Sequence, residues 1–141
     1  MAHFAHGTAL KIGDAASPEV FTEIAEVTSI SGPGMAADAI ETTHHSVTDF
    51  TRTFIAGLKD YGEVSIEGNF LPAGGTQDVS TGLLKKYEDR TLTNYQLVFT
   101  DAGNTTWALT ALVTAFEPAN PFDDKSSFSC TLKLSSKPTL A

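Results

Sequence analysis

Residues 63–70 read EVSIEGNF and form the most regular pattern of the chain. Apolar or small residues alternate here with polar ones, the first set being Val64, Ile66, Gly68 and Phe70 and the second Glu63, Ser65, Glu67 and Asn69. Because successive side chains of a strand point to opposite faces, this period of two predicts a β-strand with one buried and one solvated face.

The same alternation recurs at residues 126–134, SSFSCTLKL, and predicts a second strand. Between the two, residues 94–118 predict a hairpin, because residues 101–104 are types that tolerate positive φ and bond to their own backbone. The second strand of this hairpin carries one apolar set on one face, Trp107, Leu109, Ala111 and Val113, and another on the opposite face, Ala108, Leu112 and Phe116. We therefore expect both sides of that strand to be covered.

Further strands are expected at residues 8–12, 21–30 and 39–45. Helical spacing occurs in one segment, where Val79, Leu83 and Tyr87 recur every four residues and predict a helix over about 78–89, with Asp78 or Ser80 as its N-cap. The pattern is therefore that of a mainly β protein, with one helix among about seven strands.

The composition limits the function classes. A chain of 141 residues fits one domain spanning 1–141, and a net charge of −8 argues against an electrostatic grip on nucleic acid. The single cysteine, Cys130, allows no internal disulfide and is expected to be a small buried hydrophobe. The N-terminus lacks a signal-peptide pattern, and no apolar run reaches the ~18 residues of a membrane span, so we expect no membrane association.

The stretch ETTHHSVTDF, residues 41–50, brings together side chains that could ligate zinc or iron, namely Glu41, His44, His45 and Asp49. A strand over 39–45 would place the two histidines on opposite faces, so only one of them could join a given site. No HxH, HExxH or CxxC spacing supports a metal site. We expect surface or interface histidines and no metal.

Catalytic patterns are also missing from the sequence. There is no GxSxG motif, and the glycines of LPAGGTQD, residues 71–78, lack the lysine and the spacing of a phosphate-binding loop, so we expect a flexible loop there. Glu63 and Glu67 would stand roughly 13 Å apart on one face of a strand, whereas glycosidase carboxylates sit about 5–9.5 Å apart. We expect a solvated acidic face, and neither enzyme activity nor a cofactor.

The longest stretch without clean periodicity, residues 45–62, contains four large apolar residues, Phe50, Phe54, Ile55 and Leu58. Loops longer than ~12–15 residues in a compact domain are usually functional or disordered. Large apolar groups in a loop need a surface to cover them, so we expect this segment to meet a partner.

Four segments together resemble the tail tube (major tail) proteins of long-tailed bacteriophages, including those of related gene-transfer-agent particles. The segments are GTALKIGD (7–14), FTEIAEVTSISGPG (21–34), FIAGLKDYGEVSIEGNF (54–70) and the C-terminal region from TWALT to KPTL (106–140). The resemblance rests on their order along nearly the whole chain rather than on a catalytic motif.

This resemblance implies an antiparallel β-sandwich or partly rolled barrel with one flanking helix. It implies a structural virion protein of the tail, assembled in the bacterial host cytoplasm, whose hexameric rings stack into a hollow tube. DNA would pass through the lumen without specific binding. The partners implied are the tape measure protein, the tail terminator and the distal tail or baseplate proteins.

The resemblance also implies roles for particular residues. The segment 45–62 would be an assembly loop that reaches the neighbouring ring. The N-terminal MAHFAH matches no pattern of the family, and we expect residues 1–7 to be a flexible N-terminal arm. Glu63 and Glu67 would face the lumen. The anchors of the ring–ring contact would be Phe50, Arg52, Phe54, Ile55 and Leu58.

Two alternatives remain at this point. A monomeric β-sandwich binding module, such as a carbohydrate-binding domain, would present an exposed aromatic platform, but Trp107 falls on an expected core face. A small metal hydrolase would rest on His44, His45 and Asp49, and has the weakest support in the sequence.

Overall fold

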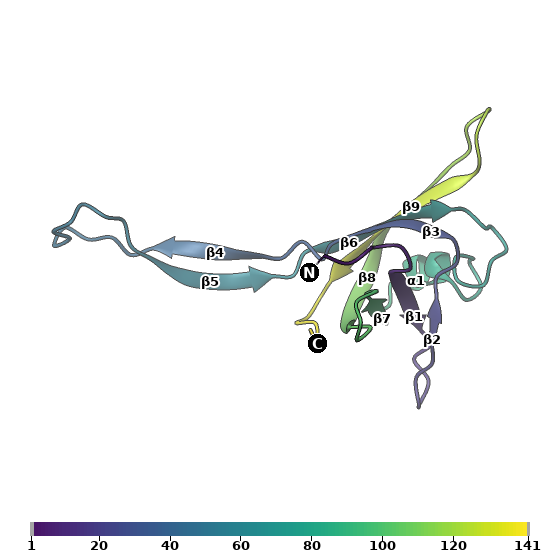
Figure 1. Cartoon of the computed structure of the whole chain (residues 1–141), viewed down its shortest axis with the longest axis horizontal. Helices are drawn as coiled ribbons and strands as arrows, with labels where there is room; N and C mark the ends of the chain where they lie inside the picture. Colours follow the sequence, from purple (N-terminus) through teal and green to yellow (C-terminus); the bar gives the residue numbers. More distant parts are fainter. Residues whose placement is uncertain (1, 141) are drawn as a thin grey trace.

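The computed structural model describes residues 2–140. Seven strands form one antiparallel sheet in the order β2-β1-β7-β8-β9-β6-β3, and the other two, β4 and β5, form a separate pair (Figure 1). The strands of the large sheet are β1 (Ala9–Gly13), β2 (Phe21–Glu23), β3 (Val27–Ser31), β6 (Glu63–Asn69), β7 (Thr93–Val98), β8 (Thr106–Ala119) and β9 (Ser127–Leu134).

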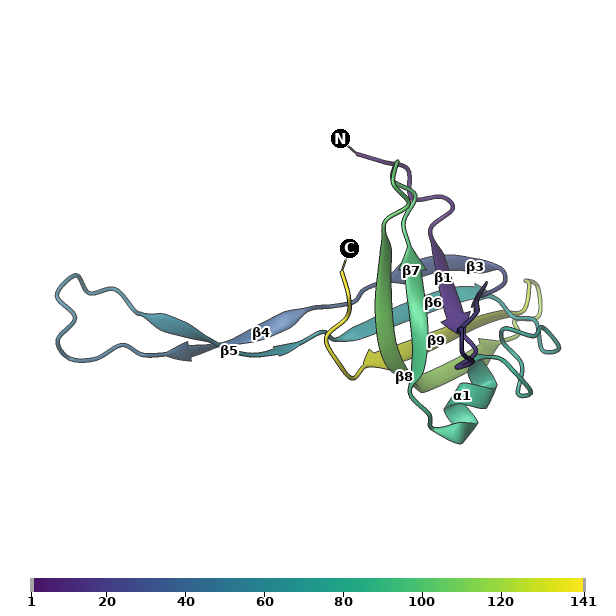
Figure 2. The same ribbon diagram turned by 90° about the horizontal axis from the view of Figure 1, so that it is seen from below.

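The large sheet folds over at β8 and does not close. β8 pairs with β7 over 106–111 and with β9 over 111–119, so it belongs to both halves of the sheet. Figure 2 shows the half containing β1 and β7 crossing the half containing β3, β6 and β9. A register shift between Val113 and Ala115 marks the bend, where the Thr114 hydroxyl donates to the Thr131 carbonyl at 3.3 Å. The expected partly rolled antiparallel architecture is confirmed.

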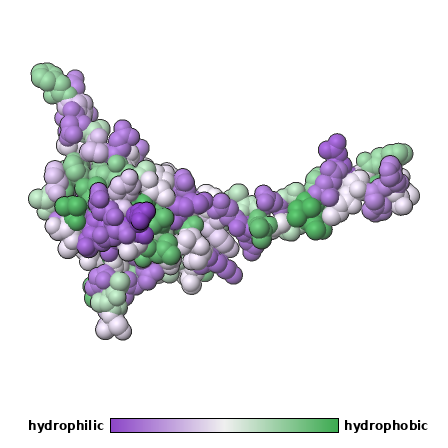
Figure 3. Space-filling model, turned by 180° about the vertical axis from the view of Figure 1, so that it is seen from behind, coloured by the Kyte–Doolittle hydropathy of each residue, from purple (hydrophilic) through white to green (hydrophobic). Residues whose placement is uncertain are grey.

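The second sheet is a long hairpin that projects from the body, and we call it the arm. It consists of β4 (Ala36–Glu41), β5 (Phe54–Asp60) and the residues between them (Figure 1). Figure 3 shows hydrophobic groups along it. The sequence interpretation of this region was wrong in two ways: 54–60 is a strand rather than part of a loop over 45–62, and the preceding strand ends at Glu41 instead of extending to 45.

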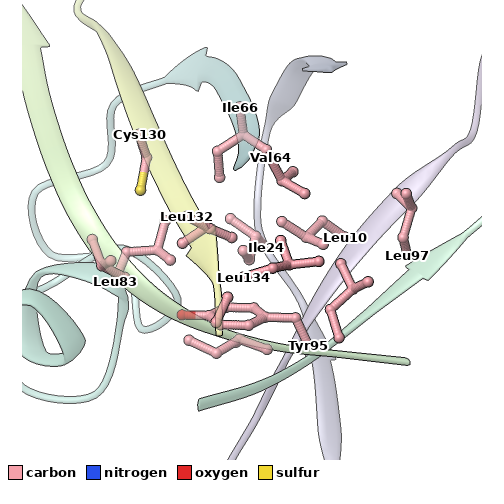
Figure 4. Packing of buried hydrophobic residues seen from close by; sticks show 14 of the residues in the cluster. Leu10, Ile24, Val64, Ile66, Leu83, Tyr95, Leu97, Cys130, Leu132 and Leu134 are labelled. Atoms are coloured by element: carbon pink, nitrogen blue, oxygen red, sulfur yellow. The ribbon is translucent and has the colours of Figure 1, made fainter. Parts of the chain in front are cut away.

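The core lies between the two halves of the folded sheet (Figure 4). β6 and β9 alternate buried and exposed residues as predicted, and Cys130 is buried. The most deeply buried side chains include Leu10, Ile24, Val64, Ile66, Leu83, Tyr95, Leu97 and Leu132. Beyond the bend, Phe116 stacks on Phe128 with ring centres 5.3 Å apart, at the margin of this core.

The helix α1 (Leu83–Asp89) is shorter than the predicted 78–89. The Asp78 carboxylate accepts hydrogen bonds from the backbone N–H groups of Thr81 and Gly82, so it closes a turn before the helix and does not cap it. Val79 therefore lies outside the helix and is exposed, whereas Leu83 is buried beneath β8. No helix within residues 2–140 is long and apolar enough to cross a membrane.

The loop before α1 was expected to be flexible, but hydrogen bonds hold it in place. Gln77 is fully buried; its amide donates to the carbonyls of Ala25 and Asn69 and accepts from the Leu71 N–H. The expected single strand over 21–30 is also interrupted, because Glu26 adopts a left-handed conformation with φ of 55° and separates β2 from β3.

Candidate assembly surfaces

The arm presents apolar side chains on both of its faces. Ile40 pairs with Ile55, and Glu41 pairs with Phe54, so the neighbours Phe54 and Ile55 point to opposite faces. Leu58, further along β5, is exposed. A two-stranded ribbon cannot bury both of its faces by itself, so these groups have no covering layer within the subunit.

The tip of the arm carries the other two predicted anchors, Phe50 and Arg52, both exposed. Phe50 has a left-handed backbone with φ of 59°, next to a turn in which the Asp49 carboxylate accepts from the Thr51 N–H at 3.2 Å. The structure thus brings all five predicted anchor residues together on one projecting element.

His44 and His45 lie in this tip and not in a strand, so the argument from strand alternation does not apply to them. The His44 ring nitrogen Nδ1 accepts a hydrogen bond from the Ser46 N–H at 3.2 Å. Among residues 2–140, no group of three or more His, Cys, Asp or Glu side chains is arranged to hold a metal ion.

The arm joins the body through glycines. The chain enters through Gly32 and Gly34 and returns through Gly62. Gly32 and Gly62 have positive φ, and a Cβ atom on Gly62 would stand 2.1 Å from the Gly34 carbonyl oxygen. The two chain segments therefore approach too closely for any side chain at this position.

An ion pair braces the joint. Lys133 of β9 donates to both carboxylate oxygens of Asp60 at 3.0 and 3.1 Å, and the Gly62 N–H donates to the same carboxylate at 2.8 Å. The Gly62 hydrogen bond, followed by the Lys133 interaction, lowers the pKa of Asp60 below its usual value. Asp60 is largely exposed and Lys133 is partly exposed, so the pair orients the arm more than it stabilises the fold.

The outer face of β6 carries Glu63 and Glu67, both exposed, as the alternation predicted. Register places Ser29, Glu67, Ser129 and Glu117 in one row across β3, β6, β9 and β8. Side chains in such a row share a face. Glu67 and Glu117 also line one shallow hollow of about 400 Å³. We call this face of β3, β6, β9 and the second half of β8 the wall face.

Glu117 was missed by the sequence analysis for a physical reason. Strict alternation from Val113 places Glu117 on the core side, but the bulge at Thr114 shifts the phase by one residue. The signal available in the sequence is Phe116, a large apolar residue out of phase with Val113.

The four strands of the wall face have two free edges among the described residues. β3 is hydrogen-bonded to β6 on one side, and its other edge has no strand partner. β8 loses its contact with β7 after Ala111, so residues 112–119 are paired with β9 alone. Unpaired strand edges are templates for pairing with another chain.

Other candidate groups are used for packing. Burial raises the pKa of Cys130 to about 12, which keeps the thiol protonated and unreactive. Trp107 packs edge-to-face against Phe99 at 5.0 Å, partly buried beside the core, and so does not form the aromatic platform of a carbohydrate-binding module.

Comparison with protein families gives a match over nearly the whole chain. Residues 5–141 match the model described as "Lambda phage tail tube protein, TTP". No curated protein sequence matches the chain.

Solved structures match the fold at low sequence identity. The tail of an empty GTA particle with C6 symmetry has a TM-score of 0.80 and 15% identity, over 99% of both chains. An extracellular contractile injection system, in its PVC sheath/tube terminator structure, gives 0.74 and 14%, over 100% of this chain and 97% of that one. The SPP1 tail tube gives 0.68 and 8%, over 95% and 77%.

Proposed function

The chain belongs to the lambda phage tail tube protein family, and on this premise we propose that its whole length forms one subunit of hexameric rings that stack into a hollow tube. The family is one of structural virion proteins of the tail, which argues for assembly rather than catalysis as its role. The proposal extends to the tape measure protein within the lumen, to terminator and baseplate proteins at the tube ends, and to DNA as the passing cargo.

Ring closure is supported by the two free edges of the wall face. β8, β9, β6 and β3 alternate in direction, because each neighbouring pair is antiparallel. β3 of one subunit therefore runs antiparallel to residues 112–119 of the next subunit when their edges meet. Each subunit contributes four strands to a closed barrel, which leaves no exposed edge.

The wall face is then the lumen lining. It carries Glu63, Glu67 and Glu117 among hydroxyl side chains such as Ser65 and Ser129. Lys133 on this face is paired with Asp60, and Lys125 lines the shallow hollow together with Glu67 and Glu117, so carboxylates are in excess. An acidic lining repels phosphates, so DNA slides along it without adhering.

We assign stacking to the arm, and the observation that supports this assignment is the continuity of the arm with the wall. β3 and β6 are paired, and β4 and β5 continue the same two chain segments outward, so the arm is the extension of a wall hairpin past the rim (Figure 1). Since barrel strands run obliquely along the barrel axis, an extension of two of them leaves the ring toward the next one. Phe50, Arg52, Phe54, Ile55 and Leu58 then meet the adjacent ring.

The test is electron microscopy and solution mass of the purified protein and of a variant in which a short Gly/Ser linker replaces residues 36–60. The wild type is expected to form tubes of constant diameter. The variant is expected to keep the circular dichroism spectrum of a folded body and to form no tubes. A wild type that stays monomeric at high concentration, or a variant that forms normal tubes, contradicts the proposal.

The lumen assignment has its own test. We expect tubes of an E67K/E117K variant to retain short double-stranded DNA at low salt, whereas wild-type tubes release it. Tubes of an E88K variant, which changes an exposed charge on α1 instead, serve as the control. If tubes of both variants retain DNA equally, Glu67 and Glu117 do not line the lumen.

A further inference from the structure

We propose that Phe122, at the tip of the β8–β9 hairpin, docks into an apolar hollow at the base of the arm of a second copy in the adjacent ring. The inference rests on the stacking of rings proposed above and names a second contact between them. It adds a site on the body of the subunit to the contact made by the arm.

The two elements lie at opposite rims of the wall. The arm leaves at the rim where β3 ends and β6 begins, whereas residues 120–126 connect β8 to β9 at the far rim. Figure 1 shows the β8–β9 connection projecting away from the body on the side opposite to the arm. In a head-to-tail stack, the far rim of one ring faces the arm rim of the next, so the two elements meet.

Phe122 is an exposed aromatic residue at the tip of a hairpin. Its side chain is fully exposed, and it lies in the turn at the tip of a hairpin that projects beyond the core. The neck of the hairpin is held by a hydrogen bond between the Ser126 hydroxyl and the Asn120 side chain. An exposed aromatic side chain at the tip of a projecting hairpin is typical of an interface anchor.

The hollow at the arm base fits such a side chain. It has a volume of about 320 Å³, and its lining includes Met35, Tyr61, Leu140 and Ala37. An apolar cavity of about 150 Å³ already accommodates a benzene ring. Met35 and Leu140 are exposed in the isolated subunit and become covered when the hollow is occupied.

The charges around the two elements are complementary. Asp123, Asp124 and Lys125 follow Phe122 at the tip and are all exposed, so two carboxylates stand beside one cation there. Lys59 and Asp60 both line the hollow at the arm base, and the Asp60 carboxylate is already paired with Lys133. Docking of Phe122 therefore brings two carboxylates toward Lys59, which forms no ion pair with another residue in the described part of the chain.

The experiment compares tube formation by F122S and by L92S, which removes an exposed apolar residue between α1 and β7. We expect F122S to raise the protein concentration needed for tubes at least tenfold and L92S to leave it unchanged. K59E should also raise the protein concentration needed for tubes. Adding D123K to the K59E chain should lower this concentration again, because every copy supplies both the hairpin tip and the hollow. Equal thermal unfolding of all variants as monomers verifies that the fold is intact.

Cross-linking locates the contact directly. A chain carrying F122C and A37C should give a ladder of covalent multimers when tubes are oxidised, since the native Cys130 is buried and Phe122 and the hollow lie at opposite rims of the wall within one subunit. The pair F122C and L92C should give none. If the wild type forms tubes, but F122S forms them equally well or the F122C/A37C chain gives no ladder, the docking proposal alone is overturned. If the wild type forms no tubes, the stacking proposal is overturned as well.

Discussion

The body and the arm bury their apolar residues in different places. In the body, Leu132 is fully buried among side chains of the same subunit, whereas Leu58 in the arm is 86% exposed. The body therefore contains the interactions that stabilise its own fold. The arm contains apolar groups whose covering layer, by our proposal, belongs to other subunits.

The largest expected effect is a difference between identical substitutions in the two regions. L132A should lower the free energy of unfolding by about 2–5 kcal/mol, because it leaves a cavity in the core. L58A should change it by less than about 0.5 kcal/mol, since the side chain is exposed. Urea unfolding of the two monomeric variants measures both values. Equal losses would mean that Leu58 belongs to the subunit core.

Hydrogen exchange should separate the regions within one protein. Backbone amides of β6 and β9 are expected to exchange only through global unfolding, whereas those of β4 and β5 exchange through local opening of a two-stranded ribbon. In assembled tubes, the arm amides should become strongly protected. An arm that exchanges equally fast in monomers and tubes would contradict its role in stacking.

A smaller effect is expected at the joint between the regions. G62A forces an alanine into a left-handed conformation, which costs about 1–2 kcal/mol, and places a Cβ atom against the Gly34 carbonyl. Thermal unfolding should show the loss. G103A is the matched control, because Gly103 has open space around it; comparable destabilisation by both would argue against a tight joint.

The smallest expected effect concerns the brace between Asp60 and Lys133. The pKa of Asp60 is lower in the folded protein than its usual value of 3.8, so the stabilisation is present above pH 3.8 and is lost as pH falls through the folded pKa. Wild type and D60N should therefore differ slightly in melting temperature at pH 7, and the difference should shrink as pH falls below 3.8. A difference that persists at lower pH would exclude the carboxylate as its source.

The sequence was sufficient for the parts of the fold whose burial is internal. Val64 and Ile66 in β6, and Cys130 and Leu132 in β9, alternate with polar residues because one face packs on the core and the other meets solvent. The turn at 101–104 followed from residues suited to positive φ, and Asn104 adopts a φ of 49°. These features depend on interactions within the subunit and can therefore be predicted from its sequence alone.

The sequence did not predict that the arm is a hairpin, and the reason is the opposite one. Phe54, Ile55 and Leu58 give no period of two, because both faces of the ribbon are apolar and neither is covered within the subunit. The anchor residues could be predicted without predicting the strands, because large apolar residues with no covering surface already indicated contact with a partner. Glu117 required the bulge at Thr114, which no periodicity in the sequence predicts.

The glycine joint also has a mechanical consequence. Because the arm and the β3–β6 hairpin are one pair of chain segments interrupted at Gly32, Gly34 and Gly62, tension applied to the arm passes along covalent backbone into the wall. At the interruption the Gly34 N–H donates to the Glu63 carbonyl at 3.3 Å, and the Asp60–Lys133 pair spans the same place, so the joint fixes the direction of the arm. If rings stack as proposed, the position of one ring relative to the next is therefore set at this joint rather than by the core.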